Sequence, residues 1–267
     1  MSAGKVLVVL PTLGDRLDHL RETLGTIDAA RAEVDLTLAV VLPEGADAAR
    51  ALASEHGAVV VTDPRRGISE AINAGIGAAT DETYYAWMGD DDLYRPHGLK
   101  VLRELLERNP DAVVAYGGCE YIDPEGRVIG ISAAGRLAQV LLPWGPCLVP
   151  HPGSMIRLSA MREAGLFDPA LRFAMDLDMF LKLRRQGRFV CTRRPVSAFR
   201  WHPDSLTVSN RKGSSDEAAR VKARHLPRWL RPVSPLWHEP VKVAATFAAR
   251  AVNRRARALA AKAGGAP

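Results

Sequence analysis

The sequence predicts an α/β protein built on an open, mostly parallel sheet. In the first ninety residues, short apolar runs typical of buried strands alternate with segments whose apolar residues recur every three or four positions, as in amphipathic helices. The links between these segments are short, which favours strand–helix–strand units. No GxGxxG follows the first strand, which counts against a dinucleotide-binding domain, and the sequence has no P-loop motif.

The strands of the first half are continuous apolar runs, which suit burial on both faces of a sheet. They lie at residues 6–10, 36–42, 58–61 and 83–88. Its helices carry apolar residues three and four positions apart, beginning with Leu17, Leu20, Leu24 and Ile27. They lie at residues 17–27, 46–56 and 68–79.

Beyond Pro96 the pattern is less regular. Residues 117–136 predict an irregular hairpin around Pro124–Gly126, and residues 143–152, rich in proline and glycine, predict a loop. The remaining strands are predicted at 112–116 and 154–157, and the helices at 97–108, 159–164 and 175–186. Residues 210–215 predict a flexible link, and residues 240–263 an Ala/Arg-rich helix.

Composition is that of a soluble globular chain: 267 residues, of which 47% are hydrophobic and 25% charged. No charged-then-apolar leader is present at Met1, and no apolar run reaches the ~18 residues of a membrane span. The three cysteines, Cys119, Cys147 and Cys191, are far apart and lack CxxC spacing. They predict buried thiols in a reducing cytoplasm, without a zinc site or a disulfide framework.

Charge is unevenly distributed along the chain. Residues 218–267 hold eleven Lys or Arg and a single acid, Glu239, a net charge of +10, whereas the whole chain carries +6. Residues 1–217 therefore carry about −4. A basic tail on a mildly acidic body predicts that the tail meets something anionic.

Polar residues follow each predicted strand of the first half. Sheets of this class bind ligands in the crevice beyond the carboxyl ends of their strands, so these residues are candidates for a binding site. They are Thr12, Asp15, Glu44, Asp63, Arg65, Arg66 and the run Asp90–Asp92.

Three consecutive carboxylates, Asp90, Asp91 and Asp92, repel one another at the end of an apolar strand. Such a cluster is stable if a cation lies among them, because hard divalent ions take oxygen ligands and cancel the repulsion. If the strand continues, Asp90 and Asp92 share one side and Asp91 faces the other. The alternative is a solvated acidic turn that precedes the helix near Pro96.

Four segments together carry a resemblance to the family-2 glycosyltransferases, over roughly residues 4–205. Val8–Thr12 is similar to the family's opening strand, and Gly67–Gly75 to its G-x-x-x-A-x-N-x-G helix, which includes Asn73. Met88–Asp92 resembles its DXD region. Gly165–Asp168 and Asp176–Asp178 are similar to its G-x-F-D and E-D-x-D-L blocks.

The resemblance implies a nucleotide-diphospho-sugar-binding GT-A fold and an inverting enzyme that uses Mn²⁺ or Mg²⁺. By this resemblance Pro11 and Thr12 contact the nucleotide, Asp90 the ribose, and Asp91 the metal, with Asp92 as a second metal contact. The implied domains are a catalytic domain at 1–209 and a basic helical extension at 210–267. Within the first, residues 1–98 bind the nucleotide-sugar and residues 99–209 the acceptor.

An inverting transfer needs a general base that takes the proton of the acceptor hydroxyl. The resemblance assigns this role to Asp176, which the helical pattern places near the start of a helix. There a carboxylate is also favoured by the helix dipole alone. Asp178, two positions on, is assigned to helix-end structure or to the acceptor-side wall of the site.

The other candidates each have a structural alternative. His202 resembles the family's late R-x-H-x-x-S segment and is assigned to the metal, although a lone histidine is often merely packed. His151 and Trp144 are assigned to the acceptor side, with packing as the alternative. Arg66 adds positive charge near the phosphates, unless it is a solvated turn residue.

Two departures from the family pattern concern recognition rather than chemistry. Glu44 stands near the position where the family has a base-reading aspartate, and Gly89 stands at the first DXD position. We therefore expect an active inverting transferase that moves a sugar from a nucleoside-diphosphate donor, UDP or dTDP favoured, to a hydroxyl of a glycan, glycolipid or small molecule. The alternatives are a sugar-phosphate nucleotidyltransferase and an inactive sugar-nucleotide-binding module.

The basic tail allows two interpretations. Arg250, Arg254 and Arg257 share a helical face, so the tail could hold a cytoplasmic protein peripherally on the anionic inner face of a membrane, near a lipid-linked acceptor. A solvated or oligomer-packing helix is the other. Nucleic acid is not an expected partner, because no aromatic residues interleave with the arginines.

Overall fold

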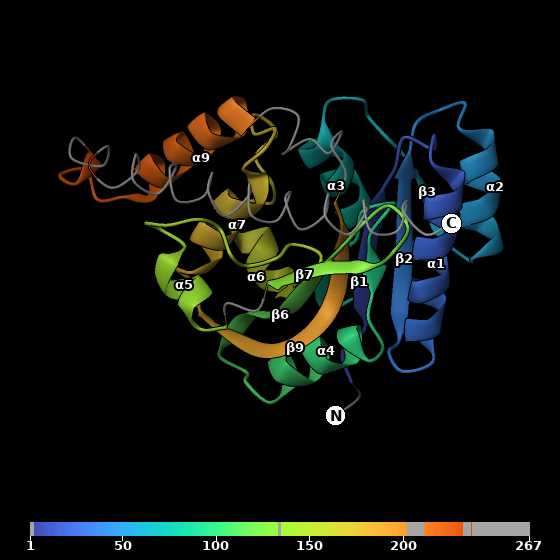
Figure 1. Cartoon of the computed structure of the whole chain (residues 1–267), viewed down its shortest axis with the longest axis horizontal. Coiled ribbons are helices and arrows are strands. Elements are labelled where there is room, and N and C mark those ends of the chain that lie inside the picture. The colour runs from blue at the N-terminus through green and yellow to red at the C-terminus, as the bar shows by residue number, and fades with distance from the viewer. Residues whose placement is uncertain (1–2, 133–134, 202–210, 232–235, 237–267) are drawn as a thin grey trace, which may run out of the picture.

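The computed structural model describes residues 3–132, 135–201, 211–231 and 236. The predictions for His202 and for the helix at 240–263 lie outside these residues. At the centre of the described part is one nine-stranded sheet with helices on both faces (Figure 1).

The bounds of most predicted elements lie within a few residues of the observed ones. The strands are β1 (Val6–Pro11), β2 (Leu36–Leu42), β3 (Val59–Thr62), β4 (Tyr84–Trp87), β5 (Leu93–Tyr94), β6 (Ala112–Ile122), β7 (Val128–Ser132), β8 (Ser154–Arg157) and β9 (Arg188–Arg200). The helices are α1 (Leu17–Arg31), α2 (Asp47–Glu55), α3 (Ile68–Ile76), α4 (Gly98–Glu107), α5 (Leu137–Leu141), α6 (Leu158–Glu163), α7 (Met175–Leu183) and α9 (Arg211–His225).

Strand order divides the sheet into a parallel and a mixed part. The order is β3-β2-β1-β4-β8-β6-β9-β5, with β7 on β6. The first four strands are all parallel, as predicted, so their carboxyl ends share one edge. Beyond β4 the pairing is mixed: β8 runs antiparallel to both β4 and β6, while β6 and β9 are parallel.

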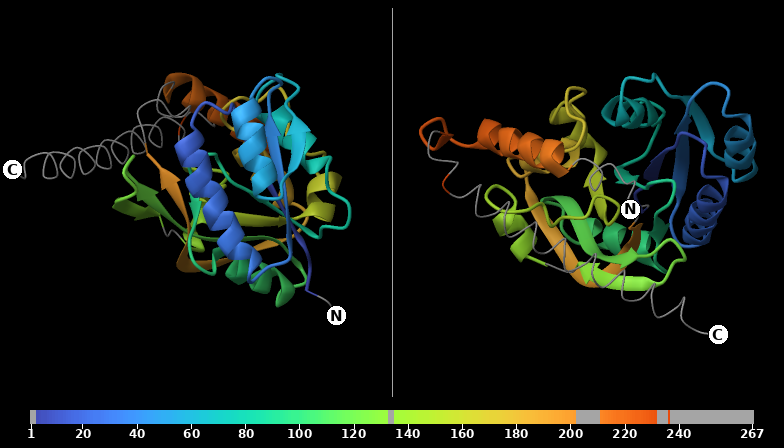
Figure 2. Two further views of the ribbon diagram at one scale, coloured as in Figure 1. Left: turned by 90° about the vertical axis from the view of Figure 1, so that its right-hand side faces the viewer. Right: turned by 45° about the horizontal axis from the view of Figure 1, so that its top comes forward.

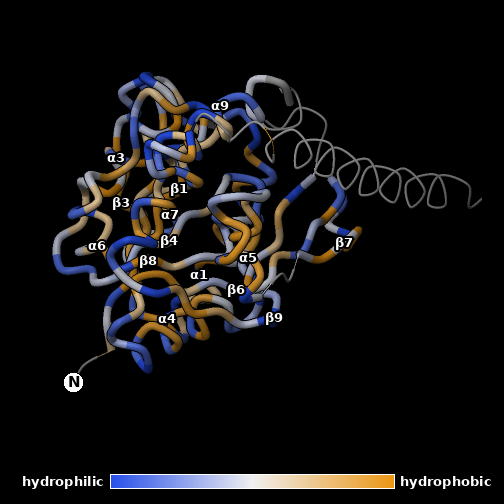
Figure 3. The backbone as a smooth tube through the Cα atoms, turned by 90° about the vertical axis from the view of Figure 1, so that its left-hand side faces the viewer, coloured by the Kyte–Doolittle hydropathy of each residue, from blue (hydrophilic) through white to orange (hydrophobic). Residues whose placement is uncertain are grey.

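Side chains of the inner strands alternate between two cores, as period-two geometry requires. On one face Val6, Val8 and Leu10 of β1 pack with α1, α2 and α4. On the other, Leu7 and Val9 pack with α3, α6 and α7. The left view of Figure 2 shows α1 and α2 side by side. In Figure 3 the orange of hydrophobic residues marks the inner strands of the sheet.

Close packing on the second face depends on a glycine of α3. A Cβ atom at Gly75 would lie 2.5 Å from a Val9 methyl carbon and 2.9 Å from one of Val41. The G-x-x-x-A-x-N-x-G helix therefore presses its backbone directly onto β1 and β2, next to the edge where the polar residues gather.

Of two predictions for less regular segments, one is confirmed and one is wrong. The irregular hairpin predicted at 117–136 is confirmed: β6 and β7 pair antiparallel around the turn at Pro124–Gly126, with a register shift between Tyr121 and Ile122. Residues 211–215, expected to be a link, belong to α9, because buried contacts with α7 stabilise a helix that the local sequence does not favour.

Among the described residues, no helix is both long and apolar enough to cross a membrane. The sheet is continuous across residue 98, since β4 pairs with β8 and β8 with β6. The division of the chain at residues 98 and 209 stays a prediction.

Candidate active site

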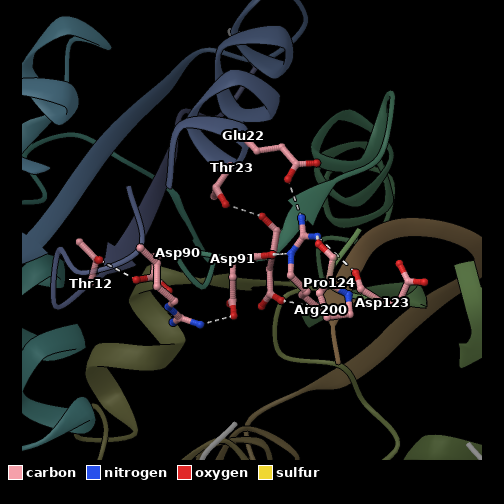
Figure 4. Close-up of polar contacts among 10 residues, drawn as sticks. Thr12, Glu22, Thr23, Asp90, Asp91, Asp123, Pro124 and Arg200 are labelled. Atoms are coloured by element: carbon pink, nitrogen blue, oxygen red, sulfur yellow. Dashed lines mark hydrogen bonds and ion pairs between the residues drawn. The ribbon is translucent and has the colours of Figure 1, made fainter. Parts of the chain in front are cut away.

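The carboxyl ends of β1 and β4 bring Thr12 and Asp90 together, although 78 positions separate them. The Thr12 hydroxyl donates a 2.6 Å hydrogen bond to Asp90 Oδ2, and the Gly14 amide donates to Thr12 Oγ1 at 2.9 Å. Because β1 and β4 are adjacent parallel strands, the residues that follow them meet at one edge (Figure 4). The carboxyl-end prediction is correct for this pair.

Arg16, at the start of α1, bridges two carboxylates. Its guanidinium lies 2.5 Å from Asp90 Oδ1 and 2.5 Å from Asp91 Oδ2. These side chains are only 7% and 13% exposed, whereas the Arg16 side chain is 39% exposed. The guanidinium thus supplies the positive charge that adjacent buried carboxylates require.

The prediction that Asp90 and Asp92 share a side is wrong. Residues 90 and 91 form a turn between β4 and β5, and the Asp92 amide donates to the Gly89 carbonyl at 3.3 Å. Strand alternation ends with β4 at Trp87, and Asp90 and Asp91 face Arg16 together. Glycine at 89 leaves room for this turn, because a Cβ atom there would lie 2.8 Å from Asp92 Oδ2.

Asp92 faces the protein interior, with 1% of the residue exposed. Its Oδ1 accepts a 3.0 Å hydrogen bond from the Arg200 amide at the end of β9. Burial and the neighbouring Asp91 charge raise the pKa of Asp92 well above its usual range, against the Arg200 amide, which lowers it. These contacts do not support the predicted role of Asp92 as a second metal ligand; they make it an anchor of the turn.

Arg200 holds the back of the same turn. It is 2% exposed, and its guanidinium has four hydrogen-bond acceptors, at 2.6–3.3 Å. They are the Asp91, Asp123 and Pro124 carbonyls and the Glu22 carboxylate (Figure 4). One buried side chain therefore joins the acidic turn to α1 and to the β6–β7 turn.

The carboxylate pair suits a divalent cation with few protein ligands. Burial raises the pKa of Asp90, while the Thr12 hydroxyl and Arg16 lower it, so the Asp90 anion depends on its neighbours. No cluster of three or more His, Cys, Asp or Glu with metal-site geometry occurs in the described ranges, and His202 lies outside them. Mg²⁺ is commonly held by one or two carboxylates, with substrate phosphates and water completing its shell. Asp90 and Asp91 fit that arrangement.

Asp176 lies in the first turn of α7, as the helical pattern predicts. Its Oδ1 accepts a 2.7 Å hydrogen bond from the Leu177 amide. Burial, with a smaller contribution from the Glu217 carboxylate, raises its pKa to about 6, against the backbone hydrogen bonds, which lower it. A carboxyl group with a pKa near 6 is a suitable general base at neutral pH, being ionised yet more basic than an exposed aspartate.

Asn73 is engaged in a structural tie. Its amide nitrogen donates to the Phe167 carbonyl at 2.9 Å, and its Oδ1 accepts from the Phe167 amide at 3.1 Å. Ser69, one turn earlier, donates to the Leu171 carbonyl at 2.9 Å. Both amide atoms of Asn73 are occupied, so its position connects α3 to the turn before α7, and the predicted contact with the donor receives no support.

The predicted acceptor-side residues do not form one surface. His151 is buried, stacked on Trp87 at 4.6 Å between ring centroids, and burial lowers its pKa to about 3. Asp178 faces α9, 2.8 Å from His225 Nε2 and 2.9 Å from Lys182 Nζ. Those two residues pack the interior. Trp144 is 40% exposed, and its acceptor role stays a prediction.

The other predicted donor contacts are at the parallel edge, after their strands. Pro11 ends β1, and the Thr12 amide extends the ladder to the Val41 carbonyl at 2.8 Å. Glu44 and Arg66 are exposed beyond β2 and β3. Asp63 Oδ1 accepts from the Arg65 amide at 2.8 Å and so shapes the turn after β3.

Arg16 and Arg200 are the site residues that the sequence analysis missed. Arg16 follows the polar loop after the first strand by one position, so the carboxyl-end rule could have included it. Arg200 is the arginine of the R-x-H-x-x-S segment, but that motif does not reveal its contact with the acidic turn, because β9 reaches this turn only through the folded sheet.

Comparison with known sequences identifies one family. Residues 10–163, more than half of the chain, match the family model described as Glycosyl transferase family 2. Among curated proteins there is no match.

Solved structures share the fold. TarS 1-349 of S. aureus in complex with UDP-GlcNAc gives a TM-score of 0.64 at 14% identity, over 83% of this chain and 66% of that chain. Mannosyltransferase PcManGT from Pyrobaculum calidifontis, in complex with GDP-Man and Mn²⁺, gives 0.62 at 18% identity, over 99% and 81%. This chain spans less than two thirds of the TarS 1-349 structures and 39% of the longer TarS structure. The predicted GT-A fold is confirmed.

Proposed function

Since the chain belongs to glycosyl transferase family 2, we propose that it is an inverting transferase that moves a hexosyl group from a nucleoside diphosphate to an acceptor hydroxyl. The observation that carries the proposal is the pair of carboxylates Asp90 and Asp91. Both contact the Arg16 guanidinium at the carboxyl ends of β1 and β4. Donor binding in open α/β sheets uses this edge.

Asp176 is the proposed general base. The acceptor oxygen attacks the anomeric carbon as the bond from that carbon to the diphosphate breaks, and the hydroxyl proton passes to the Asp176 carboxylate. Its raised pKa supports this assignment, and its place at the start of α7 fixes it on a rigid element.

Asp91, with Asp90 beside it, would hold Mn²⁺ or Mg²⁺. When bound, the ion neutralises charge that develops on the departing diphosphate. Asp90 is also the proposed ribose contact, oriented by the Thr12 hydroxyl. Arg66 is exposed beyond β3, where it can approach the phosphates.

Donor and acceptor remain as the sequence predicts: UDP or dTDP sugars, and a glycan, glycolipid or small-molecule hydroxyl. Glu44 is the proposed reader of the base and Trp144 the proposed stacking platform for the acceptor. A cytoplasmic enzyme, held peripherally on the inner membrane face by its basic extension, would suit a lipid-linked acceptor.

The test is nucleotide binding measured by calorimetry. UDP, dTDP and GDP are titrated with Mn²⁺, with Mg²⁺ or with EDTA into the wild-type protein and the Asp91→Ala variant. One nucleotide should bind in the presence of metal. Its affinity should fall by roughly 10- to 1000-fold with EDTA or in Asp91→Ala, because the ion contributes several kcal/mol.

Asp18→Ala is the matched control. Asp18 is fully exposed in the first turn of α1, near the site but outside it, and should leave binding unchanged. If none of the nucleotides binds with either metal, the proposed function is wrong. Turnover of the bound donor, compared between wild type and Asp176→Asn, then separates a transferase from an inactive binding module.

A further inference from the structure

Helix α9 packs against the helix that carries Asp176. Figures 1 and 2 show α9 and α7 as neighbours, and the face of α9 toward α7 carries buried residues at four-residue spacing. Val221 is fully buried and Glu217 is 7% exposed. One turn further on, His225 Nε2 lies 2.8 Å from Asp178 of α7. A helix that begins at residue 211 thus packs directly on the helix that carries Asp176.

The Glu217 carboxylate binds the backbone that leads into α7. Its Oε1 accepts hydrogen bonds from the amides of Phe173 at 2.6 Å and Ala174 at 2.7 Å, and both oxygens lie within 3.2 Å of the Arg172 amide. These amides precede the first turn of α7, where the helix dipole favours an anion. The helix has no side-chain cap of its own, so a residue 43 positions away supplies the anion.

We propose that Glu217 is a positioning residue, which fixes the start of α7 and thereby the orientation and basicity of Asp176. The inference rests on the proposed role of Asp176 as the base. Ala174 is the N-cap of α7 and Asp176 lies two positions later, so a shift of residues 172–174 moves the Asp176 carboxylate directly. The two carboxylates also interact: the Glu217 charge adds to burial in raising the pKa of Asp176.

The other ionisable groups around Asp176 act more weakly on it. The Cys147 thiol, in the loop before β8, is kept neutral by burial and the Asp176 charge, which raise its pKa. Lys222 of α9 is committed to the Gly145 carbonyl at 2.5 Å. Asp178, on α7 itself, is paired with Lys182 and His225. Glu217 therefore has two effects: it binds the backbone at the start of α7, and it raises the pKa of Asp176.

The test compares Glu217→Gln, Glu217→Ala and wild type by three measurements. In Glu217→Ala, amide hydrogen exchange at residues 172–174 should accelerate by about 10- to 100-fold, since a hydrogen bond to a charged group is lost. In Glu217→Gln the amide oxygen still accepts, and exchange should change less. The pKa of Asp176, followed by carboxyl-carbon NMR, should fall in Glu217→Gln, and the acid limb of kcat/KM should move to lower pH with it.

Glu82→Gln is the matched control. Glu82 is also 7% exposed and also accepts a backbone hydrogen bond, from the Thr80 amide at 2.7 Å, but it precedes β4 at the opposite end of the sheet. It should lose stability without affecting the pKa of Asp176 or exchange at 172–174. Equal pKa values for Asp176 in wild type and Glu217→Gln, or unchanged exchange in Glu217→Ala, would overturn the proposal. Exchange and NMR need no substrate, so a missing activity would count against the proposed function alone.

Discussion

Replacing Arg16 by Gln should tighten the binding of a divalent cation in the absence of nucleotide. Arg16 contacts Asp90 and Asp91 at 2.5 Å each, so an ion that takes Asp91 displaces the guanidinium from at least one carboxylate. The Arg16 side chain is 39% exposed, and ion pairs of this kind contribute about 0.2–1 kcal/mol each. Two pairs amount to roughly 0.4–2 kcal/mol, which corresponds to about a 2- to 30-fold lower Kd for Mn²⁺.

The assay is a titration of Mn²⁺ followed by the EPR signal of the free ion. Arg21→Gln is the control: it lies further along α1, is 62% exposed, and pairs only loosely with Asp18 at 3.4 Å. Its Kd should equal that of the wild type. An unchanged or weaker affinity in Arg16→Gln would refute the idea that the guanidinium and the ion compete for the same carboxylates.

Three further predictions concern packing, the turn and the base. Gly75→Ala should lower the free energy of unfolding in urea by about 1–3 kcal/mol, because its Cβ meets Val9 at 2.5 Å. Gly25→Ala, with nothing within 4 Å, should raise it by up to about 1 kcal/mol; the opposite order would contradict this account. Arg200→Lys should lower the free energy of unfolding by about 2–5 kcal/mol and weaken Mn²⁺ binding, because lysine cannot donate to all four acceptors. An unaltered urea midpoint would contradict this prediction. Wild-type kcat/KM should fall as pH drops through about 6, where Asp176 takes up a proton and ceases to be a base; a flat profile there would exclude Asp176.

The first half of the fold was predictable because its signals are local. The observed β2 has the predicted bounds, 36–42, since a strand buried on both faces is a continuous apolar run. β9 was not predicted, because Arg193, Arg194 and Pro195 interrupt its apolar pattern, and its pairing with β6 contains register shifts. α9 was missed because the contacts that stabilise it lie in α7, not in its own sequence.

The residues of the candidate site were likewise predictable only where the signal is local in the sequence. Thr12 and Asp90 could be placed together, because adjacent parallel strands end at a common edge. The sides on which the three aspartates lie could not be predicted, because the turn after Trp87 is held by contacts with Arg200 of β9. Asn73 was assigned to the donor, and Asp178 to helix-end structure or the acceptor-side wall, because their hydrogen-bond partners, Phe167 and His225, lie 94 and 47 positions away.

The double hydrogen bond between Asn73 and Phe167 has a mechanical consequence. It joins α3, which packs on β1 and β2, to the turn that leads to α7. A hinge motion that moved α3 away from residues 167–171 would break both bonds and separate Ser69 from Leu171 as well. We therefore expect the enzyme to admit its substrates without a domain movement, with adjustment confined to side chains such as Arg16 and to surface turns. Its two substrates would meet on a framework whose spacing is fixed before either arrives.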